Sequence, residues 1–143
     1  MSTHKYQARK CEEDGFKFDS MLERDTYLQL KRLHDAGDIR QIELQRKFEL
    51  YSRTGVLVGK YIADFYCILN NGMDVVVEAK GVCTPIWQRT KRHFLADYSH
   101  IPLIVVHNRN AFPLILEDLM PPPPTEKKTT KKKKLAAGRK SGR

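Results

Sequence analysis

The sequence lacks any long apolar run. None of its 143 residues lie in a stretch that approaches the roughly 18 consecutive apolar residues of a membrane-spanning helix. Its polar first ten residues, MSTHKYQARK, do not have the apolar core of a secretory signal. We therefore expect a protein that contacts no membrane and is located in the cytoplasm.

Cysteine is also scarce. Cys11, Cys67 and Cys83 are odd in number and show neither C-x-x-C nor Cys/His metal spacing. This pattern argues against a disulfide framework and a zinc site, and it favours a reducing compartment. The chain has no internal repeat, and its length suits one domain with one core.

Acidic residues are nearly absent from the end of the chain. Nine of the 26 Lys and Arg residues, but only one of the 17 Asp and Glu residues, fall in 125–143. The rest is close to neutral. Pro121–Pro124 separates an expected domain, 1–120, from a linker and Lys-rich tail, 121–143, which we expect to be disordered. Such a tail suits nucleic acid, another anionic surface or a solubilising role.

Residues 1–18 are expected to form an arm. Lys5, Arg9 and Lys10 precede an acidic segment and Gly15. One interpretation is a frayed terminus. The other is a basic arm that contacts a phosphate backbone.

A helix is predicted from Ser20 to about Ala36. Ser20 and Glu23 have the spacing of a capping box, and Gly37 is suited to ending the helix. Glu23 has two interpretations. Its carboxylate either caps the Ser20 backbone N–H or points from the buried side of the helix toward the sheet, where it would reach a metal.

Three consecutive antiparallel strands should follow. In 39–51, Ile42, Leu44, Phe48 and Leu50 fall on one side, and Arg46 is the exception. A second strand runs to Leu69 and a third covers 73–80.

The turn between the second and third strands determines their register. A three-residue loop, Asn70-Asn71-Gly72 with Gly72 left-handed, places Asp64 opposite Glu78 on one face. A two-residue turn would separate the two carboxylates across the sheet. We predict the three-residue loop.

The second half of the chain completes an α/β pattern. Thr84-Pro85 should begin a helix that runs to about Tyr98 and carries several polar and basic side chains. Residues 101–107 read as a strand covered on both faces, and 112–120 as a short helix or turn at the edge. The order helix, three strands, helix, strand predicts a small domain with a mixed central sheet flanked by helices.

Three charged residues stand where these strands should be apolar. Asp64, Glu78 and Lys80 follow or interrupt apolar segments, and an unpaired buried carboxylate is costly. Two carboxylates on one face suit Mg²⁺, and an ammonium beside them can orient an attacking water. The pattern therefore suggests phosphodiester hydrolysis. The alternative is a structural ion-pair cluster.

These residues carry a resemblance to the PD-(D/E)xK nuclease superfamily, which has a restriction-endonuclease-like αβββαβ core. Asp64 matches the first acid, with Ala63 in place of proline, and Glu78-Ala79-Lys80 matches the E-x-K motif. Glu23 matches the acid of the first helix, which favours its active-site role. The segments KYQARK, DGFKFDSMLE, YIADF and EAKGVCTP resemble small phage-type nucleases similar to Holliday junction resolvases, over residues 5–107.

The resemblance implies a Mg²⁺-dependent, or Mn²⁺-dependent, DNA endonuclease that cuts four-way junctions as a homodimer in a bacterial or phage-infected cell. Asp64, Glu78 and Glu23 would bind metal, and Lys80 would support the attacking water. The expected DNA contacts are Lys5, Arg9, Lys10, Gln88, Arg89, Lys91 and Arg92. Two alternatives remain: a nickase or restriction-like nuclease, and a non-catalytic basic DNA-binding module.

Overall fold

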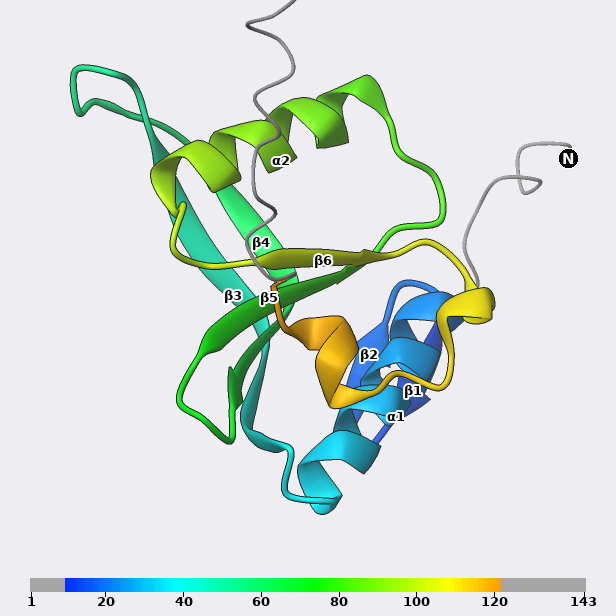
Figure 1. Ribbon diagram of the computed structural model, residues 1–143. Coiled ribbons are helices and arrows are strands. Elements are labelled where there is room, and N and C mark those ends of the chain that lie inside the picture. The colour runs from blue at the N-terminus through cyan, green and yellow to red at the C-terminus, as the bar shows by residue number, and fades with distance from the viewer. Residues whose placement is uncertain (1–9, 122–143) are drawn as a thin grey trace, which may run out of the picture.

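A four-stranded sheet with the order β3-β4-β5-β6 organises the computed structural model, which describes residues 10–121. Its strands are β3 (Ile39–Tyr51), β4 (Leu57–Leu69), β5 (Asp74–Ala79) and β6 (Leu103–Val106). The first three are antiparallel, and β6 runs parallel to β5. The expected α/β class, with a mixed sheet flanked by two helices, is confirmed (Figure 1). Lys5, Arg9 and the Lys-rich tail lie outside the described residues.

The two helices begin at the predicted caps. The Ser20 hydroxyl accepts the Glu23 N–H at 3.0 Å at the start of α1 (Met21–Asp35), and Gly37 follows its end with a φ of 86°. The Thr84 hydroxyl accepts the Trp87 N–H at 3.1 Å at the start of α2 (Pro85–Asp97). Both contacts satisfy main-chain donors that a helix leaves free in its first turn.

The sheet has an apolar cluster on each face. Side chains alternate along β5, so Val75 and Val77 pack with α1 whereas Val76 packs with α2. Strand β6 contributes to both clusters, as predicted for a strand covered on both faces. Beyond it, η2 (Arg109–Ala111) and η3 (Leu116–Leu119) are short 3₁₀ helices, and Leu119 is buried in the cluster beside α1.

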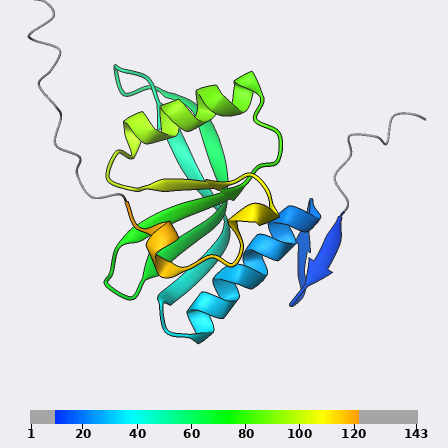
Figure 2. The same cartoon turned by 45° about the vertical axis from the view of Figure 1, so that its right-hand side comes forward.

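The expected arm is wrong for the described residues before α1. Strands β1 (Cys11–Glu13) and β2 (Phe16–Phe18) form a hairpin that lies against α1 (Figure 2). Asp14 and Gly15 form its turn with φ values of 53° and 82°, which suits a two-residue hairpin turn. The hairpin is anchored by Phe18, which is 1% exposed, and by Asp14, whose carboxylate accepts from the Tyr27 hydroxyl at 2.9 Å.

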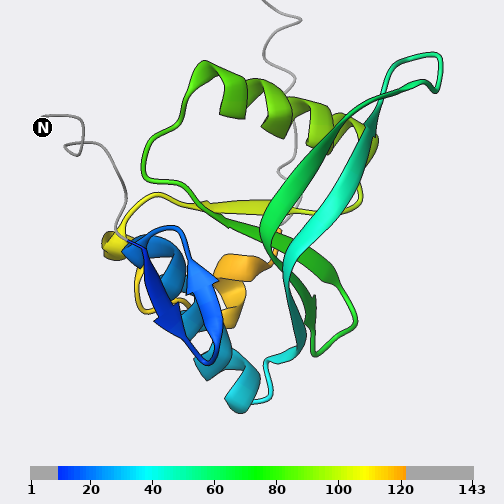
Figure 3. The ribbon, with the colours of Figure 1, turned by 180° about the vertical axis from the view of Figure 1, so that it is seen from behind.

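The register predicted for β4 and β5 is confirmed. The Leu69 N–H donates to the Met73 carbonyl at 2.8 Å, and Gly72 has a φ of 86°. Phe65 lies opposite Val77, so one step further along both strands Asp64 faces Glu78. The pairing of β4 with β5 ends at Phe65, and from there outward β4 pairs with β3 alone. The β3–β4 hairpin therefore extends past the rest of the sheet (Figure 3), and Asp64 lies where the strands divide.

The prediction that one side of β3 carries all four of its apolar residues is wrong. Ile42 and Leu44 pack on the cluster beside α1, whereas Phe48 and Leu50 belong to the cluster beside α2. The change of face occurs at Gln45, whose φ is 56°. A left-handed residue rotates the strand, and this places Arg46, the exception to the alternation, over the Tyr66 ring at 4.0 Å.

Neither α1 nor α2, the α-helices of residues 10–121, is long and apolar enough to cross a membrane. All three cysteines carry free thiols. Cys67 is buried, and burial raises the pKa of its thiol to about 12.

Candidate active site

Asp64 and Glu78 bind each other's main-chain segments where β4 and β5 divide. The Asp64 N–H donates to Glu78 Oε2 at 3.3 Å, and the Ala79 N–H donates to Asp64 Oδ2 at 3.0 Å. In a continuous antiparallel ladder the Ala79 N–H would donate to a carbonyl of β4, and here the Asp64 carboxylate takes that place. The exchange fixes the two acids side by side, as the three-residue loop predicted.

Two further elements contribute polar side chains to this point. Glu23 projects from α1, is 7% exposed, and its Oε1 accepts from Gln45 Nε2 at 3.3 Å. Glu78 Oε2 also accepts from the Tyr61 hydroxyl at 3.2 Å. Of the two interpretations of Glu23, the structure shows the one in which the carboxylate turns toward the sheet.

Burial and mutual repulsion make this cluster electrostatically unusual. Burial, followed by the nearby charge of Asp64, raises the pKa of Glu78 to about 8. The same two causes raise the pKa of Glu23 to about 7. Burial also raises the pKa of Asp64, against opposing hydrogen bonds and the positive charge of Lys80. Three acids with raised pKa values thus lie together, and perturbed pKa values of this kind cluster at functional sites.

Lys80 lies beside the acids without pairing with them. Its ammonium is 5.3 Å from the centre of the Trp87 ring, a cation–π contact that holds it near the start of α2. Within residues 10–121, no salt bridge joins Lys80 to an acid. A structural ion-pair cluster would require such a bridge, so this geometry disfavours that alternative.

The donor set fits a hard divalent cation in part. Across the described part of the chain, no group of three or more His, Cys, Asp or Glu side chains is arranged to hold a metal ion. Glu23, Asp64 and Glu78, which were expected to bind the metal together, are therefore not arranged as a three-ligand site. The adjacent carboxylates of Asp64 and Glu78 are nevertheless oxygen donors of the type that Mg²⁺ takes, and this ion commonly uses one or two carboxylates together with water and phosphate.

Three of the expected DNA contacts on α2 lie together. Gln88, Lys91 and Arg92 line a hollow of about 300 Å³ between α2 and β6, which His107 also lines. His107 Nδ1 is 3.2 Å from the Lys80 carbonyl oxygen, so this hollow borders the segment that carries Lys80. Arg89 is exposed on α2 and does not line it. Lys10 is exposed beside β1, in a separate hollow of about 410 Å³ that Lys17 also lines.

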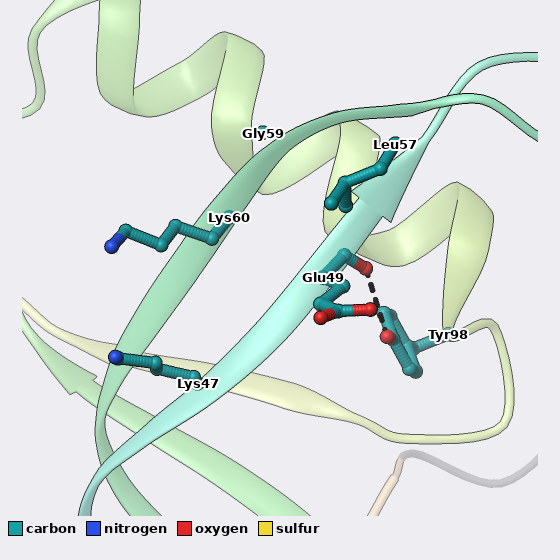
Figure 4. A pocket seen from close by; sticks show the side chains of 6 residues that line it. All are labelled: Lys47, Glu49, Leu57, Gly59, Lys60 and Tyr98. Carbon is teal, nitrogen blue, oxygen red and sulfur yellow. Dashed lines mark hydrogen bonds between the residues drawn. The ribbon is translucent and has the colours of Figure 1, made fainter.

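A larger hollow, about 750 Å³, lies away from the acids. Lys47, Glu49, Leu57, Gly59, Lys60 and Tyr98 line it, on the projecting β3–β4 hairpin and at the end of α2 (Figure 4). The Tyr98 hydroxyl donates to the Glu49 carbonyl at 2.8 Å. Because none of the four predicted catalytic residues is among its lining residues, volume alone does not identify the site here.

Sequence reasoning missed Gln45 and Tyr61, which both hydrogen-bond to the acids. Tyr61 reads as a core aromatic in an apolar strand, and it is indeed buried. For Gln45 a signal existed, because the alternation of 39–51 breaks at the next residue, Arg46. That break marks the position where the strand changes face.

Comparison with known proteins places this fold in a family. No curated protein matches the chain. A family model described as "Protein of unknown function (DUF1064)" matches residues 3–110, which include all four predicted catalytic residues, the whole sheet and both α-helices. Since that match covers most of the sequence, the chain belongs to the DUF1064 family.

Proposed function

We propose that this protein is a metal-dependent, structure-selective DNA endonuclease, and that the four-way junction is its preferred substrate. The observation that carries the proposal is the reciprocal bonding of Asp64 and Glu78 at the division of the sheet, with Glu23 and Lys80 beside them. A merely structural role would favour apolar residues here, because buried carboxylates are costly.

The residues have separate tasks in this proposal. Asp64 and Glu78 hold Mg²⁺ or Mn²⁺, and Glu23 completes the acidic site. When bound, the ion polarises the phosphodiester and lowers the pKa of an attacking water. Lys80 donates a hydrogen bond to that water and stabilises the negative charge that develops on the phosphate. The Trp87 ring keeps the Lys80 ammonium close to the site.

DNA binding rests on the basic surface near Lys80. Gln88, Lys91 and Arg92 line the hollow between α2 and β6, and we assign to it the phosphates that flank the scissile bond. The exposed Arg89 and Lys10, together with Lys5 and Arg9, would contact the backbone further away. A symmetric junction needs two cuts, which a homodimer with twofold symmetry supplies. Cleavage of such DNA implies a cytoplasmic protein that acts in DNA recombination.

The test compares labelled four-way junction, flap, linear duplex and single strand in Mg²⁺, Mn²⁺ and EDTA. We expect cleavage of the junction in either metal and none in EDTA. Asp64→Asn should reduce the cleavage rate at least ~100-fold while junction binding, measured by gel shift, persists, because the amide is isosteric but neutral. Glu43→Gln, at an exposed acid of β3, is the matched control and should cleave normally.

The outcomes separate the alternatives. Equal cleavage of junction and linear duplex would favour the nickase or restriction-like nuclease. Binding without cleavage of any substrate, in both metals and at several pH values, would contradict an enzyme and favour the DNA-binding module.

A further inference from the structure

Gln45 has a backbone conformation that is unusual within a strand. The pairing runs from Leu44–Phe65 to Arg46–Ala63, so Gln45 lies across from Asp64 in unbroken register. Its φ is nevertheless 56°, a left-handed conformation that residues other than glycine rarely adopt. Such conformations persist where surrounding structure imposes them, and they cluster at functional sites.

The side chain shows what this conformation achieves. Gln45 Nε2 donates to Glu23 Oε1 at 3.3 Å, and the Gln45 side chain lies close enough to Asp64 to oppose the rise in its pKa that burial causes. It thus connects the acid of α1 to the acid of β4. Together, Gln45, Asp64 and Glu78 form a row across three neighbouring strands at the point where the sheet divides.

Packing explains the backbone conformation but not the direction of the amide. The change of face at Gln45 lets Phe48 and Leu50 pack beside α2, whereas Gln45 itself is exposed and its side chain is not part of either apolar cluster. A neutral amide is also the suitable group beside acids that bind a cation, because it orients a carboxylate through its N–H without competing charge. Residues that hold metal ligands by a hydrogen bond typically change metal affinity or activity by about 10- to 100-fold when replaced.

We infer that Gln45 is a positioning residue of the acidic site: its left-handed backbone directs the amide to Glu23 and Asp64 and so fixes their carboxylates for divalent-cation binding. This inference rests on the proposed metal-dependent nuclease function. It concerns a residue that neither the sequence motifs nor the family match assigns.

The experiment separates the side chain from the backbone. Glycine adopts positive φ without strain, so Gln45→Gly keeps the conformation and removes only the amide. Asparagine also tolerates this region and keeps a shorter amide, so Gln45→Asn is the conservative variant. Mn²⁺ binding to the full chain is measured by electron paramagnetic resonance without DNA, and kcat and KM are measured on a four-way junction. Gln41→Ala, at an exposed glutamine of the same strand, is the matched control.

We expect Gln45→Gly to keep the thermal midpoint of the wild type, to bind Mn²⁺ about 10- to 100-fold more weakly, and to lose kcat with little change in KM for DNA. Gln45→Asn should recover part of both losses, and Gln41→Ala should match the wild type. Wild-type Mn²⁺ affinity and kcat in Gln45→Gly would overturn the inference. Failure of Gln45→Gly to fold would also overturn the inference, because it would show that the Gln45 side chain is needed for the fold itself and not for positioning the acids.

These outcomes are distinct from failure of the proposed function. If the wild type itself neither binds Mn²⁺ nor cleaves DNA, the nuclease proposal fails, and the inference about Gln45 fails with it. If the wild type does both and Gln45→Gly equals it, only the role of Gln45 is refuted.

Discussion

At the scale of single residues, the acids of this protein have structural partners as well as a proposed chemical role. Glu78 accepts from the Asp64 N–H and the Tyr61 hydroxyl, while Asp64 accepts from the Ala79 N–H. These bonds compensate in part for burial, yet the pKa of each carboxyl stays raised. The proposed cation would bring the positive charge that these raised pKa values favour.

The raised pKa of Glu78 predicts how stability depends on pH without metal. Its pKa is about 8 in the folded protein, against an ordinary value of 4.5, so the unfolded chain loses this proton first as pH rises. Stability from the protonated group is complete below pH 4.5 and is lost as pH rises through about 8. In EDTA, the free energy of unfolding should fall by up to about 5 kcal/mol over this range, since one pKa unit corresponds to about 1.4 kcal/mol.

Urea unfolding at pH 5, 7 and 9 measures this dependence. Glu78→Gln removes the titrating group but keeps an acceptor, so its stability should vary less with pH and exceed that of the wild type at pH 9. Glu43→Gln, at an exposed acid, should retain the wild-type dependence. Parallel pH profiles for the wild type and Glu78→Gln would show that another group is responsible.

Whether a site residue could be predicted from the sequence depended on its chemical type. Asp64, Glu78 and Lys80 could be predicted because they are charged residues in apolar strands, and Glu23 could be predicted from its spacing to the helix cap. Gln45 was not, because glutamine is polar on any surface strand and does not signal positive φ as glycine or asparagine does. Its role appears only when α1 lies beside β3.

At the scale of elements, the turn between β4 and β5 determines whether the acids meet. Asn71 and Gly72 indicated a turn, but the three-residue length was predicted because a two-residue turn would place Asp64 and Glu78 on opposite faces. The Asn71 side chain accepts the Met73 N–H at 3.0 Å, which supports the loop from within. The β1–β2 hairpin was missed although Asp14-Gly15 is an equally good turn signal, because its strands have only three residues each and show little alternation.

This turn yields a prediction at a glycine. Gly72 has a φ of 86°, and a methyl group on its Cα would meet no other atom within 4 Å, so Gly72→Ala adds backbone strain without a clash. We expect a loss of about 1 kcal/mol in the free energy of unfolding, because left-handed backbone costs an L residue about that much. Cleavage should persist, since the register is unchanged.

Gly59→Ala provides the control for this prediction. Gly59 lies in β4, also has open space, and has no positive φ. Its replacement should leave stability unchanged or raise it slightly, because alanine restricts the unfolded chain. Equal effects of the two substitutions in urea unfolding would contradict a conformational requirement at Gly72.

At the scale of the whole molecule, charge is distributed unevenly along the chain. Residues 1–124 carry 17 Lys and Arg against 16 Asp and Glu, so most of the net positive charge belongs to residues 125–143. That segment lies outside the described residues. The order of the elements from α1 to β6 and the sheet class followed from hydrophobic pattern and caps. The change of face in β3 did not, because it depends on a contact between distant segments.

The tail predicts a salt effect. A chain that ends after Met120 should bind DNA more weakly and with a shallower dependence of log K on log salt, by about 0.9 for each phosphate that the tail would otherwise neutralise. Fluorescence anisotropy of a labelled junction between 50 and 300 mM salt, about the range in which counterion release dominates, measures both. An unchanged slope would exclude the tail from DNA binding.

The exchange of hydrogen bonds between Asp64 and Glu78 also determines which substitutions are informative. Alanine at Glu78 would leave the part-buried main-chain N–H of Asp64 without its acceptor, and alanine at Asp64 would do the same to the N–H of Ala79. An unsatisfied buried donor costs about 1–3 kcal/mol. An alanine variant could therefore lose activity because the strands separate locally. Asparagine at Asp64 and glutamine at Glu78 keep an acceptor oxygen, so they test the negative charge alone. In this protein the carboxylates of Asp64 and Glu78 join the two strands and are also the proposed metal ligands. Only a neutral isostere therefore separates the structural role of each side chain from its proposed catalytic role.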